Sequence, residues 1–406
     1  MSQLAIIADD LTGAADAGAP FAQAGFHTVL SLGSGSPRPD DVLVISTNSR
    51  HLPPDAAYTQ VYQASARFQH TPLVYKKMDS TLRGHPGAEL GAVMDALQAS
   101  LALVAPAFPA QMRTTVGGRQ HVGGLPLEQT PFATDVASSD ISVALSERSA
   151  AVSAAPYRTI SNIPLATVRL GPAALCAYLR RTGIMVADAE TDDDLAILAQ
   201  AALLCRLPLL CGSAGLARAL VGVMPPPESP VILPLAQRAS GPVLVVAGSR
   251  HPRTRRQVYA TGDGGAELIT PHADVLAGRL AFDRLVDAVA ASLNSGRHTV
   301  LTTVDMGDAP VGGEAIANML ASVVRQAGLR SRIGALILTG GDTAAAILTE
   351  LKAEAIWLQG EMDSGIPWGL LQGGVLPGVP VVTKAGGFGH DDTLAEAIEF
   401  LAPVHV

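Results

Sequence analysis

Short runs of apolar residues recur along the first hundred positions, and each run ends at a polar or glycine-rich turn. The runs cover residues 4–8, 42–46, 73–75 and 101–105. None of them alternates apolar with polar residues, which predicts strands buried on both faces, as in a parallel sheet covered by helices. The intervening residues 55–68 and 88–99 have helical length. A strand followed repeatedly by a helix predicts βαβ units and an α/β fold.

This alternation is interrupted once and then resumes. Between residues 116 and 134, Gly117-Gly118 and Gly123-Gly124 surround short polar segments, which predicts a hairpin or loop able to cover a site. A helix over 192–205 and a strand over 208–211 then continue the α/β pattern.

A proline-rich stretch divides the chain. Residues 225–230 read Pro-Pro-Pro-Glu-Ser-Pro, and consecutive prolines cannot continue a helix or a central strand. The 406 residues also exceed the length at which a single core keeps growing. We therefore predict two α/β domains with mostly parallel sheets and an active-site cleft between them. The predicted parts are residues 1–224, a linker over 225–241, and residues 242–406. Predicted elements beyond the linker are strands over 243–247, 299–303 and 335–339 and helices over 283–293 and 314–327.

Composition narrows the class of protein. The chain is 48% hydrophobic, 16% charged and 4% aromatic, which is typical of a folded α/β enzyme. Its net charge of −8 argues against a nucleic-acid surface, which needs clustered lysine and arginine. The N-terminus lacks the basic start of a signal peptide, and no apolar run approaches the ~20 residues that span a bilayer. We expect a cytoplasmic protein with no nucleic-acid or membrane partner.

The cysteines add little chemistry. Cys176, Cys205 and Cys211 are an odd number and form no CxxC pair. Neither a disulfide framework nor a zinc site is therefore predicted, and a reducing compartment fits.

One glycine turn in the C-terminal half has the features of an anion site. Residues 336–343 read Leu-Ile-Leu-Thr-Gly-Gly-Asp-Thr and precede a helical stretch. Gly340 and Gly341 let a ligand approach the backbone, Thr343 can cap the helix, and the N–H groups of the first turn can bind a phosphate. A tight turn with a good helix cap explains this single motif equally well.

Two further turns favour a ligand. Gly248-Ser249 and Gly386-Gly387 also come directly after apolar strands. Ligands of open α/β sheets lie beyond the carboxyl ends of the strands, so three such turns predict a nucleotide pocket. Lys384 fits a phosphate contact, although a surface lysine is the commoner explanation. The chain has neither a Walker A loop nor a GxGxxG fingerprint followed by an acidic residue.

Two polar clusters follow strands of the N-terminal half. Asp9-Asp10 comes directly after the first strand, where helix capping by Asp10 explains one acid but not the pair. Residues 76–84 read Lys-Lys-Met-Asp-Ser-Thr-Leu-Arg-Gly, which is too polar for an ordinary turn. Arg83 offers a two-pronged donor to a carboxylate, which suits a hydroxy acid as substrate. Arg50 is either a further contact or part of an exposed basic loop. His85 and His121 stand alone, and isolated histidines are seldom ligands.

In their order and spacing, these motifs resemble the four-carbon acid sugar kinase family, whose members phosphorylate threonate, erythronate or 3-oxo-tetronate. The likeness spans nearly the whole chain and is carried by residues 7–14, 76–84, 247–249, 339–343 and 384–389. The chain departs from the family pattern at His85-Pro86, where the family has Asn after Arg-Gly, and at Gln111-Met112-Arg113, where it has Asn-Gly-Arg.

The resemblance implies that the N-terminal domain binds the sugar acid and the C-terminal domain binds ATP. The implied acid contacts are Asp9, Asp10, Arg50, Lys77, Asp79, Ser80, Thr81, Leu82 and Arg83. The implied ATP contacts are Ser249, Gly340, Gly341, Asp342, Thr343, Gly386 and Gly387. Asp10 or Asp79 would orient or deprotonate the attacking hydroxyl. Mg²⁺ would span the phosphates, with Asp342 as one candidate ligand.

The sequence over 76–83 resembles the threonate and erythronate branch more than the oxo-tetronate branch. D-threonate, converted to D-threonate 4-phosphate, is therefore the first predicted substrate, with erythronate and 3-oxo-tetronate as alternatives. More distant alternatives are an NAD(P)-dependent oxidoreductase and a metabolite sensor without catalytic activity. A homo-oligomer is compatible with all of these readings.

Overall fold

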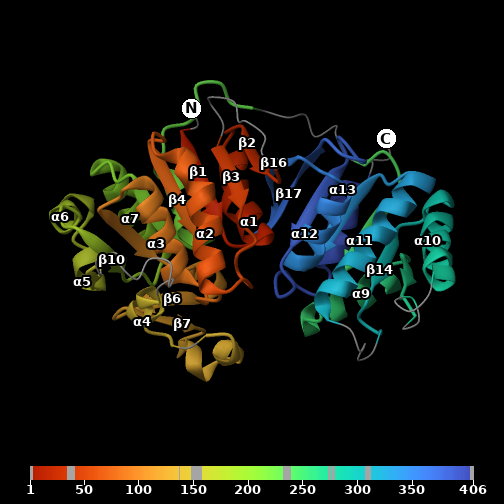
Figure 1. Cartoon of the computed structure of the whole chain (residues 1–406), viewed down its shortest axis with the longest axis horizontal. Helices are drawn as coiled ribbons and strands as arrows, with labels where there is room; N and C mark the ends of the chain where they lie inside the picture. Colours follow the sequence, from red (N-terminus) through yellow and green to blue (C-terminus); the bar gives the residue numbers. More distant parts are fainter. Residues whose placement is uncertain are drawn as a thin grey trace. The chain divides into compact units, whose positions relative to one another are not determined.

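The computed structural model describes residues 3–33, 42–136, 138–147, 158–231, 239–272, 275, 279–306 and 312–402. The chain divides into two compact units (Figure 1). Unit 1 comprises Met1–His27 and Pro37–Pro230, and unit 2 comprises Thr28–Ser36 and Val231–Val406. Residues 232–238 of the predicted linker lie outside the described residues. Among the described helices, none combines the length and hydrophobicity of a membrane span.

Unit 1 is built on a parallel sheet with helices on both faces. Its strands lie in the order β3 (Val42–Ser46), β1 (Leu4–Ala8), β4 (Leu73–Lys77), β11 (Leu209–Gly212), β5 (Leu101–Ala105), β10 (Gly183–Ala187) and β9 (Ile160–Ile163). Helices α2 (Pro54–Ser65) and α3 (Pro86–Leu97) lie side by side (Figure 1). The other helices are α1 (Leu11–Gln23), α4 (Ile141–Ser146), α5 (Leu165–Val168), α6 (Pro172–Tyr178), α7 (Asp192–Leu204) and α8 (Ala214–Val223), of which α1, α7 and α8 pack together.

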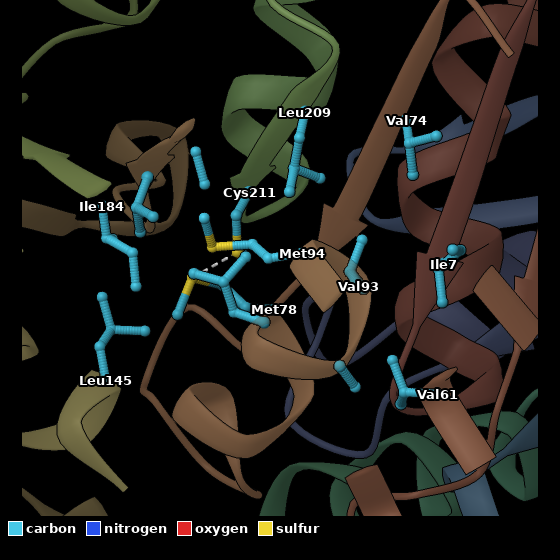
Figure 2. Packing of buried hydrophobic residues seen from close by; sticks show 14 of the residues in the cluster. Ile7, Val61, Val74, Met78, Val93, Met94, Leu145, Ile184, Leu209 and Cys211 are labelled. Carbon is cyan, nitrogen blue, oxygen red and sulfur yellow. Dashed lines mark hydrogen bonds between the residues drawn. The ribbon is translucent and has the colours of Figure 1, made fainter. Parts of the chain in front are cut away.

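The core of unit 1 lies between the sheet and helices α2 and α3. Figure 2 shows side chains from strands and helices meeting there, among them Ile7, Val61 and Val93. Burying such a side chain contributes roughly 1.5–3 kcal/mol relative to leaving it in water. Cys211 packs with its Sγ atom 3.6 Å from Met78 Sδ (Figure 2), and burial raises the pKa of this thiol to about 12. Cys211 therefore acts as a core residue rather than as a nucleophile.

A small antiparallel sheet projects from unit 1. It contains β6 (Arg113–Val116), β7 (Arg119–Val122) and β8 (Leu125–Pro126), which matches the hairpin predicted from the paired glycines. Asp188, which follows β10, accepts hydrogen bonds from the N–H groups of Gly117 and Gly118 at 2.8 and 2.9 Å. Buried Gln120 donates to the Ser80 carbonyl at 2.7 Å. These contacts fix the hairpin to the polar turn after β4.

The sheet of unit 2 is parallel at one end and antiparallel at the other. The parallel strands lie in the order β13 (Glu267–Ile269), β14 (Thr299–Thr302), β12 (Val243–Ala247), β15 (Ala335–Thr339) and β18 (Pro380–Lys384). The antiparallel strands β17 (Ile366–Gln372), β16 (Ala355–Asp363) and β2 (Thr28–Ser31) follow. Helices α10 (Arg279–Asn294), α11 (Gly313–Arg330) and α12 (Gly341–Glu350) form one packed group, and α9 (Pro252–Asp263) packs with α13 (Thr393–Leu401).

The predicted α/β class with mostly parallel sheets is confirmed. The strands over 4–8, 42–46, 101–105, 243–247 and 335–339 have the predicted bounds. The hydrophobic pattern did not reveal that β2, from the first thirty residues, completes the sheet of unit 2 by pairing with β16. Its four residues are too few to display a period, and its partner lies far along the chain.

The prediction that no disulfide forms is wrong. Cys176 and Cys205 are bonded, with Cα atoms 5.9 Å apart. Cys176 lies in α6 and Cys205 caps the C-terminus of α7, and these two helices pack against each other. A separation of 29 residues with no recognisable motif gave no sign of this proximity in the sequence.

Candidate active site

The paired acids of unit 1 lie where β1 ends and α1 begins. Asp10 is the N-cap of α1, and its Oδ1 accepts the Gly13 N–H at 2.9 Å while its Oδ2 accepts the Thr12 hydroxyl at 2.7 Å. The capping explanation for Asp10 is therefore confirmed. Asp9 is buried and makes no cap, so capping leaves it unexplained.

Arg50 joins the acids into one cluster. Its Nε donates to Asp9 Oδ2 at 2.6 Å, and its two terminal nitrogens each donate to a different oxygen of Asp10 at 2.9 Å. Arg50 Nη2 also lies 3.5 Å from Asp79 Oδ2. The arginine side chain is only 12% exposed, so the alternative of an exposed basic loop is wrong. Arg50 thus contacts two carboxylates that follow β1 and one that follows β4. It therefore fixes the geometry of the sheet edge at which these two strands end.

Asp79 is the second centre of the cluster. It accepts the backbone N–H of Thr81 at 2.9 Å and the Thr81 hydroxyl at 2.5 Å. Arg83 binds the same carboxylate with two nitrogens, at 3.1 and 2.7 Å. The two-pronged donor expected for a substrate carboxylate is thus occupied by Asp79 in this structure. Leu82 belongs to the hydrophobic core and its N–H donates to the Asp79 carbonyl at 3.0 Å, so neither its side chain nor its N–H is available to a ligand.

The charges of the cluster shift the acidity of its members. Burial by itself raises the pKa of Asp9, but the charges of Arg50, Lys76 and Lys77 outweigh it and hold the pKa below its ordinary value. Burial opposes ionisation of Asp79 as well, yet Arg83 and Arg50 hold its pKa well below its ordinary range. Both side chains are therefore carboxylates at neutral pH.

A buried pair behind the cluster was missed by the sequence reasoning. Lys76 Nζ lies 2.7 Å from Glu89 Oε2, and Ser49 donates to Glu89 Oε1 at 2.5 Å. Burial raises the pKa of Glu89. Glu89 lies inside the predicted helix over 88–99. Acidic residues are common on the exposed face of such helices, so the sequence did not indicate that this one is buried. The pair supports the turn that carries Arg50.

Arg113 is a further cation that the motifs did not identify as a site residue. It lies at the start of β6, its Nη1 donates to Ser80 Oγ, and its guanidinium stacks 5.9 Å from the centre of the Phe132 ring. Burial lowers the pKa of Arg113.

Lys77 is also buried, and its Nζ donates to the Met78 carbonyl at 2.9 Å. In the part of the chain that the structure describes, no carboxylate forms an ion pair with Lys77.

The three glycine turns of unit 2 meet at one edge of its sheet. They follow β12, β15 and β18, which are neighbouring parallel strands. The contacts are close: a Cβ atom on Gly248 would overlap the Thr343 hydroxyl, and one on Gly386 would overlap the Ser249 hydroxyl. The structure therefore brings together the residues that the sequence singled out in separate motifs.

Helix α12 begins at this edge. Its N-cap is Gly340, with a φ of 102° and no side-chain cap, so the prediction that Thr343 caps the helix is wrong. Thr343 instead lies buried in the first turn, which also holds Asp342. A glycine N-cap leaves the first N–H groups of the helix open to an anion.

The described residues contain no group of three or more His, Cys, Asp or Glu side chains that could hold a metal ion. His85 Nδ1 lies 2.9 Å from Glu147 Oε1, and His121 Nδ1 lies 3.0 Å from the Arg119 carbonyl. Both histidines thus have local polar partners.

Two family models match this chain. A sugar-binding N-terminal domain matches residues 4–220, and a nucleotide-binding C-terminal domain matches residues 244–394. The acid cluster lies within the first match and the three glycine turns within the second.

Relatives of similar length are named as kinases of four-carbon acids. A D-threonate kinase of Salmonella typhimurium is 39% identical, over 99% of this chain and 99% of its own length. A D-threonate kinase of Cupriavidus necator is 36% identical, over 97% and 96%. Kinases named for D-erythronate and 3-oxo-tetronate are less similar. A crystal structure from Salmonella typhimurium LT2 shares the fold, with a TM-score of 0.81 at 22% identity over 99% of this chain and 100% of that one. The chain belongs to the four-carbon acid sugar kinase family.

Proposed function

We propose that this protein transfers the γ-phosphoryl group of ATP to a four-carbon sugar acid, with D-threonate as substrate and D-threonate 4-phosphate as product. The observation that carries the proposal is that unit 1 holds a cluster of arginines and carboxylates and unit 2 holds three converging glycine turns, in a chain whose D-threonate kinase relatives match it over nearly its full length. Erythronate and 3-oxo-tetronate are the alternative acids.

The sugar acid is assigned to the edge of unit 1 where β1, β3 and β4 end. Lys77 supplies a buried positive charge that forms no ion pair among the described residues, although it acts on Asp9 and Asp79 from further away, and this charge suits the substrate carboxylate. Asp9, Asp10 and Asp79 accept hydrogen bonds in the ionised state and can orient hydroxyl groups. Arg50, Ser80, Thr81, Leu82 and Arg83 complete the proposed acid site.

The triphosphate is assigned to the edge of unit 2. Its proposed donors are the backbone N–H groups of Gly341, Gly386 and Gly387 and the hydroxyl groups of Ser249 and Thr343. The N–H of Gly340 donates to the Lys384 carbonyl, so Gly340 contributes by letting the phosphate approach the backbone closely. Mg²⁺ usually takes one or two carboxylates together with phosphate oxygens, so a single carboxylate at this edge would be enough to hold it. Asp342 is the proposed protein ligand. When bound, the ion would neutralise phosphate charge.

In the proposed chemical step, the C4 hydroxyl of the acid attacks the γ-phosphorus while ADP leaves, and the hydroxyl proton passes to a carboxylate of unit 1. Asp10 or Asp79 is the proposed acceptor. Asp10 is the better placed of the two, since its side chain is 17% exposed, against 8% for Asp79. We place the reaction in the cytoplasm, and a homo-oligomer stays a prediction.

The reaction is tested by measuring ADP release with D-threonate, D-erythronate and 3-oxo-tetronate as acceptors. We expect the largest kcat/KM with D-threonate and a product phosphorylated at C4 by ³¹P and ¹³C NMR. Turnover with none of the three acids would contradict the proposed function, while a preference for another acid would correct only the substrate.

A single methyl group tests the nucleotide site. Gly386→Ala places a Cβ atom onto the Ser249 hydroxyl, so one of the two turns must move. Overpacking of this kind costs about 1–3 kcal/mol, and we expect ATP affinity to fall by roughly tenfold or more, with acid affinity unchanged.

Gly313→Ala in α11 is the matched control, because its added Cβ has no neighbour within 4 Å. Isothermal titration calorimetry with ATP and with the acid measures both effects. Loss of acid binding with intact ATP binding in Gly386→Ala would reverse the assignment of the two units.

A further inference from the structure

The loop that follows β18 is fixed by side-chain hydrogen bonds to its carbonyl groups. Lys384, the last residue of β18, donates from Nζ to the carbonyls of Ala385, Gly386 and Phe388 at 3.0, 3.4 and 3.2 Å. The lysine residue is only 1% exposed. A buried ammonium has three protons to donate, and these three carbonyls account for all of them.

Helix α9 binds the other carbonyls of the same loop and shares those of Gly386 and Phe388 with Lys384. Arg253 Nη1 donates to the carbonyls of Gly387 and Gly389 at 3.3 and 2.8 Å, and Thr254 Oγ1 donates to that of Gly386 at 2.9 Å. Gln257 Nε2 donates to the carbonyls of Phe388 and His390 at 3.1 and 2.7 Å. Every carbonyl from residue 385 to residue 390 therefore accepts a side-chain hydrogen bond.

This arrangement determines where the N–H groups point. The peptide bonds described are trans, and in a trans peptide the N–H points opposite to the C=O of the preceding residue. Because the carbonyls of Ala385 and Gly386 face Lys384, the N–H groups of Gly386 and Gly387 face away from it. Neither N–H has an acceptor within the part of the chain that the structure describes.

The two glycines lie against the turn after β12. A Cβ on Gly387 would come within 3.3 Å of His251 Nε2, and Gly386 contacts Ser249. His251 Nδ1 accepts the Arg253 N–H at 3.1 Å, so in the neutral ring the proton lies on Nε2, on the side of Gly387. The N–H groups and this ring therefore belong to the proposed phosphate site.

The charges around the loop favour an anion. Neither Lys384 nor Arg253 forms an ion pair with a carboxylate among the described residues. Burial and the Arg253 charge lower the pKa of Lys384 to about 7. Burial also lowers the pKa of His251, helped by Arg253, Lys384 and Arg256. Arg256 pairs with Asp391, so the charges of Lys384 and Arg253, which have no acidic partner among the described residues, create the positive potential that a polyphosphate requires.

We propose that Lys384 and Arg253 are positioning residues, which bind the carbonyl side of the loop over 385–390 and thereby turn the N–H groups of Gly386 and Gly387 toward the phosphates of the nucleotide. This inference rests on the proposed function of unit 2. It differs from a direct phosphate contact by Lys384, because that amino group is already occupied by three carbonyls.

Two variants separate positioning from direct contact. Lys384→Met keeps the length of the side chain and removes all three donors. Thr254→Val keeps the shape of a side chain that is fully buried and uncharged, and removes only the bond to the Gly386 carbonyl. Lys352→Met, at an exposed lysine of the same unit, is the control.

Hydrogen–deuterium exchange without nucleotide gives the first measurement. We expect exchange of the peptide over 385–390 to rise by about tenfold in Lys384→Met and by less in Thr254→Val, as the orphaned carbonyls release the loop. ATP affinity and KM for ATP should worsen in the same order, while affinity and KM for the acid stay unchanged. Thr254→Val decides the question by itself if Lys384→Met does not fold.

Weaker ATP binding with unchanged exchange would show that Lys384 contacts the nucleotide directly and would overturn the proposal. Raised exchange with unchanged ATP affinity would overturn it too, because the loop geometry would then not matter. A wild-type protein that binds no ATP contradicts the proposed function, whereas the exchange measurement needs no nucleotide and tests the carbonyl contacts independently.

Discussion

Arg50→Met is expected to cause the largest loss of sugar-acid affinity of any single change in unit 1. The variant leaves Asp9, Asp10 and part of the Asp79 charge without the cation that joins them. Truncating one partner of a buried charged pair typically weakens binding by about 2–5 kcal/mol. The free energy of unfolding should fall by roughly 3–5 kcal/mol, because buried carboxylates lose their partner.

The pH dependence of this variant follows from the lowered pKa values of Asp9 and Asp79. A carboxyl group whose folded pKa lies below its unfolded value stabilises the fold above the unfolded pKa of about 3.9, and this contribution is lost as the pH falls through the folded pKa. The stability difference between wild type and Arg50→Met should therefore be full at pH 7 and shrink below about pH 4.

Chemical denaturation across this pH range and calorimetry with the acid measure both effects. Arg67→Met, at an exposed arginine of the same unit, is the control. Unchanged acid affinity in Arg50→Met would mean that the cluster has a purely structural role.

Asp10→Asn is expected to lower kcat by about 10²–10⁴ with a smaller effect on KM for the acid, as for the loss of a general base. Asp79→Asn should instead raise KM for the acid, because it breaks the contacts with Arg83 and Thr81. The strongly lowered pKa of Asp79 makes this carboxylate a weak base. For this reason we expect Asp79→Asn to affect mainly KM rather than kcat.

Steady-state kinetics with both substrates varied separates these roles. The exposed Asp193 provides the control as Asp193→Asn. A larger fall in kcat for Asp79→Asn than for Asp10→Asn would exchange the two roles. Equal and small changes in kcat would mean that neither carboxylate accepts the proton.

The sequence was informative where chemistry is local. Asp9-Asp10, residues 76–84 and the glycine turns could be recognised because their polar groups follow apolar strands directly, and parallel strands place their carboxyl ends at one edge. The convergence of Ser249 and Gly386 is a consequence of that rule. The same rule explains why Arg50, from a separate strand, reaches both acids.

Contacts between distant segments could not be predicted from the pattern. Glu89 looks like an ordinary helix acid, and only the packing of α3 under the sheet shows that it pairs with Lys76. Arg113 enters the cluster through a hairpin whose attachment depends on Asp188 and Gln120. The carbonyl contacts of Arg253 and Thr254 come from α9, more than a hundred residues before the loop that they bind. Such pairings are set by tertiary structure, which no local period encodes.

Strand β2 has a consequence for synthesis of the chain. Thr28 pairs with Leu358, so most of the polypeptide must emerge from the ribosome before this strand meets its partner. At ~5–20 residues per second the delay is on the order of tens of seconds. A fragment that starts after the proline-rich stretch lacks β2 altogether and leaves β16 with an open edge, which is a template for pairing with another chain. The sheet of unit 2 therefore cannot be completed from the C-terminal half of the chain alone, because β2 comes from residues that are translated near the start.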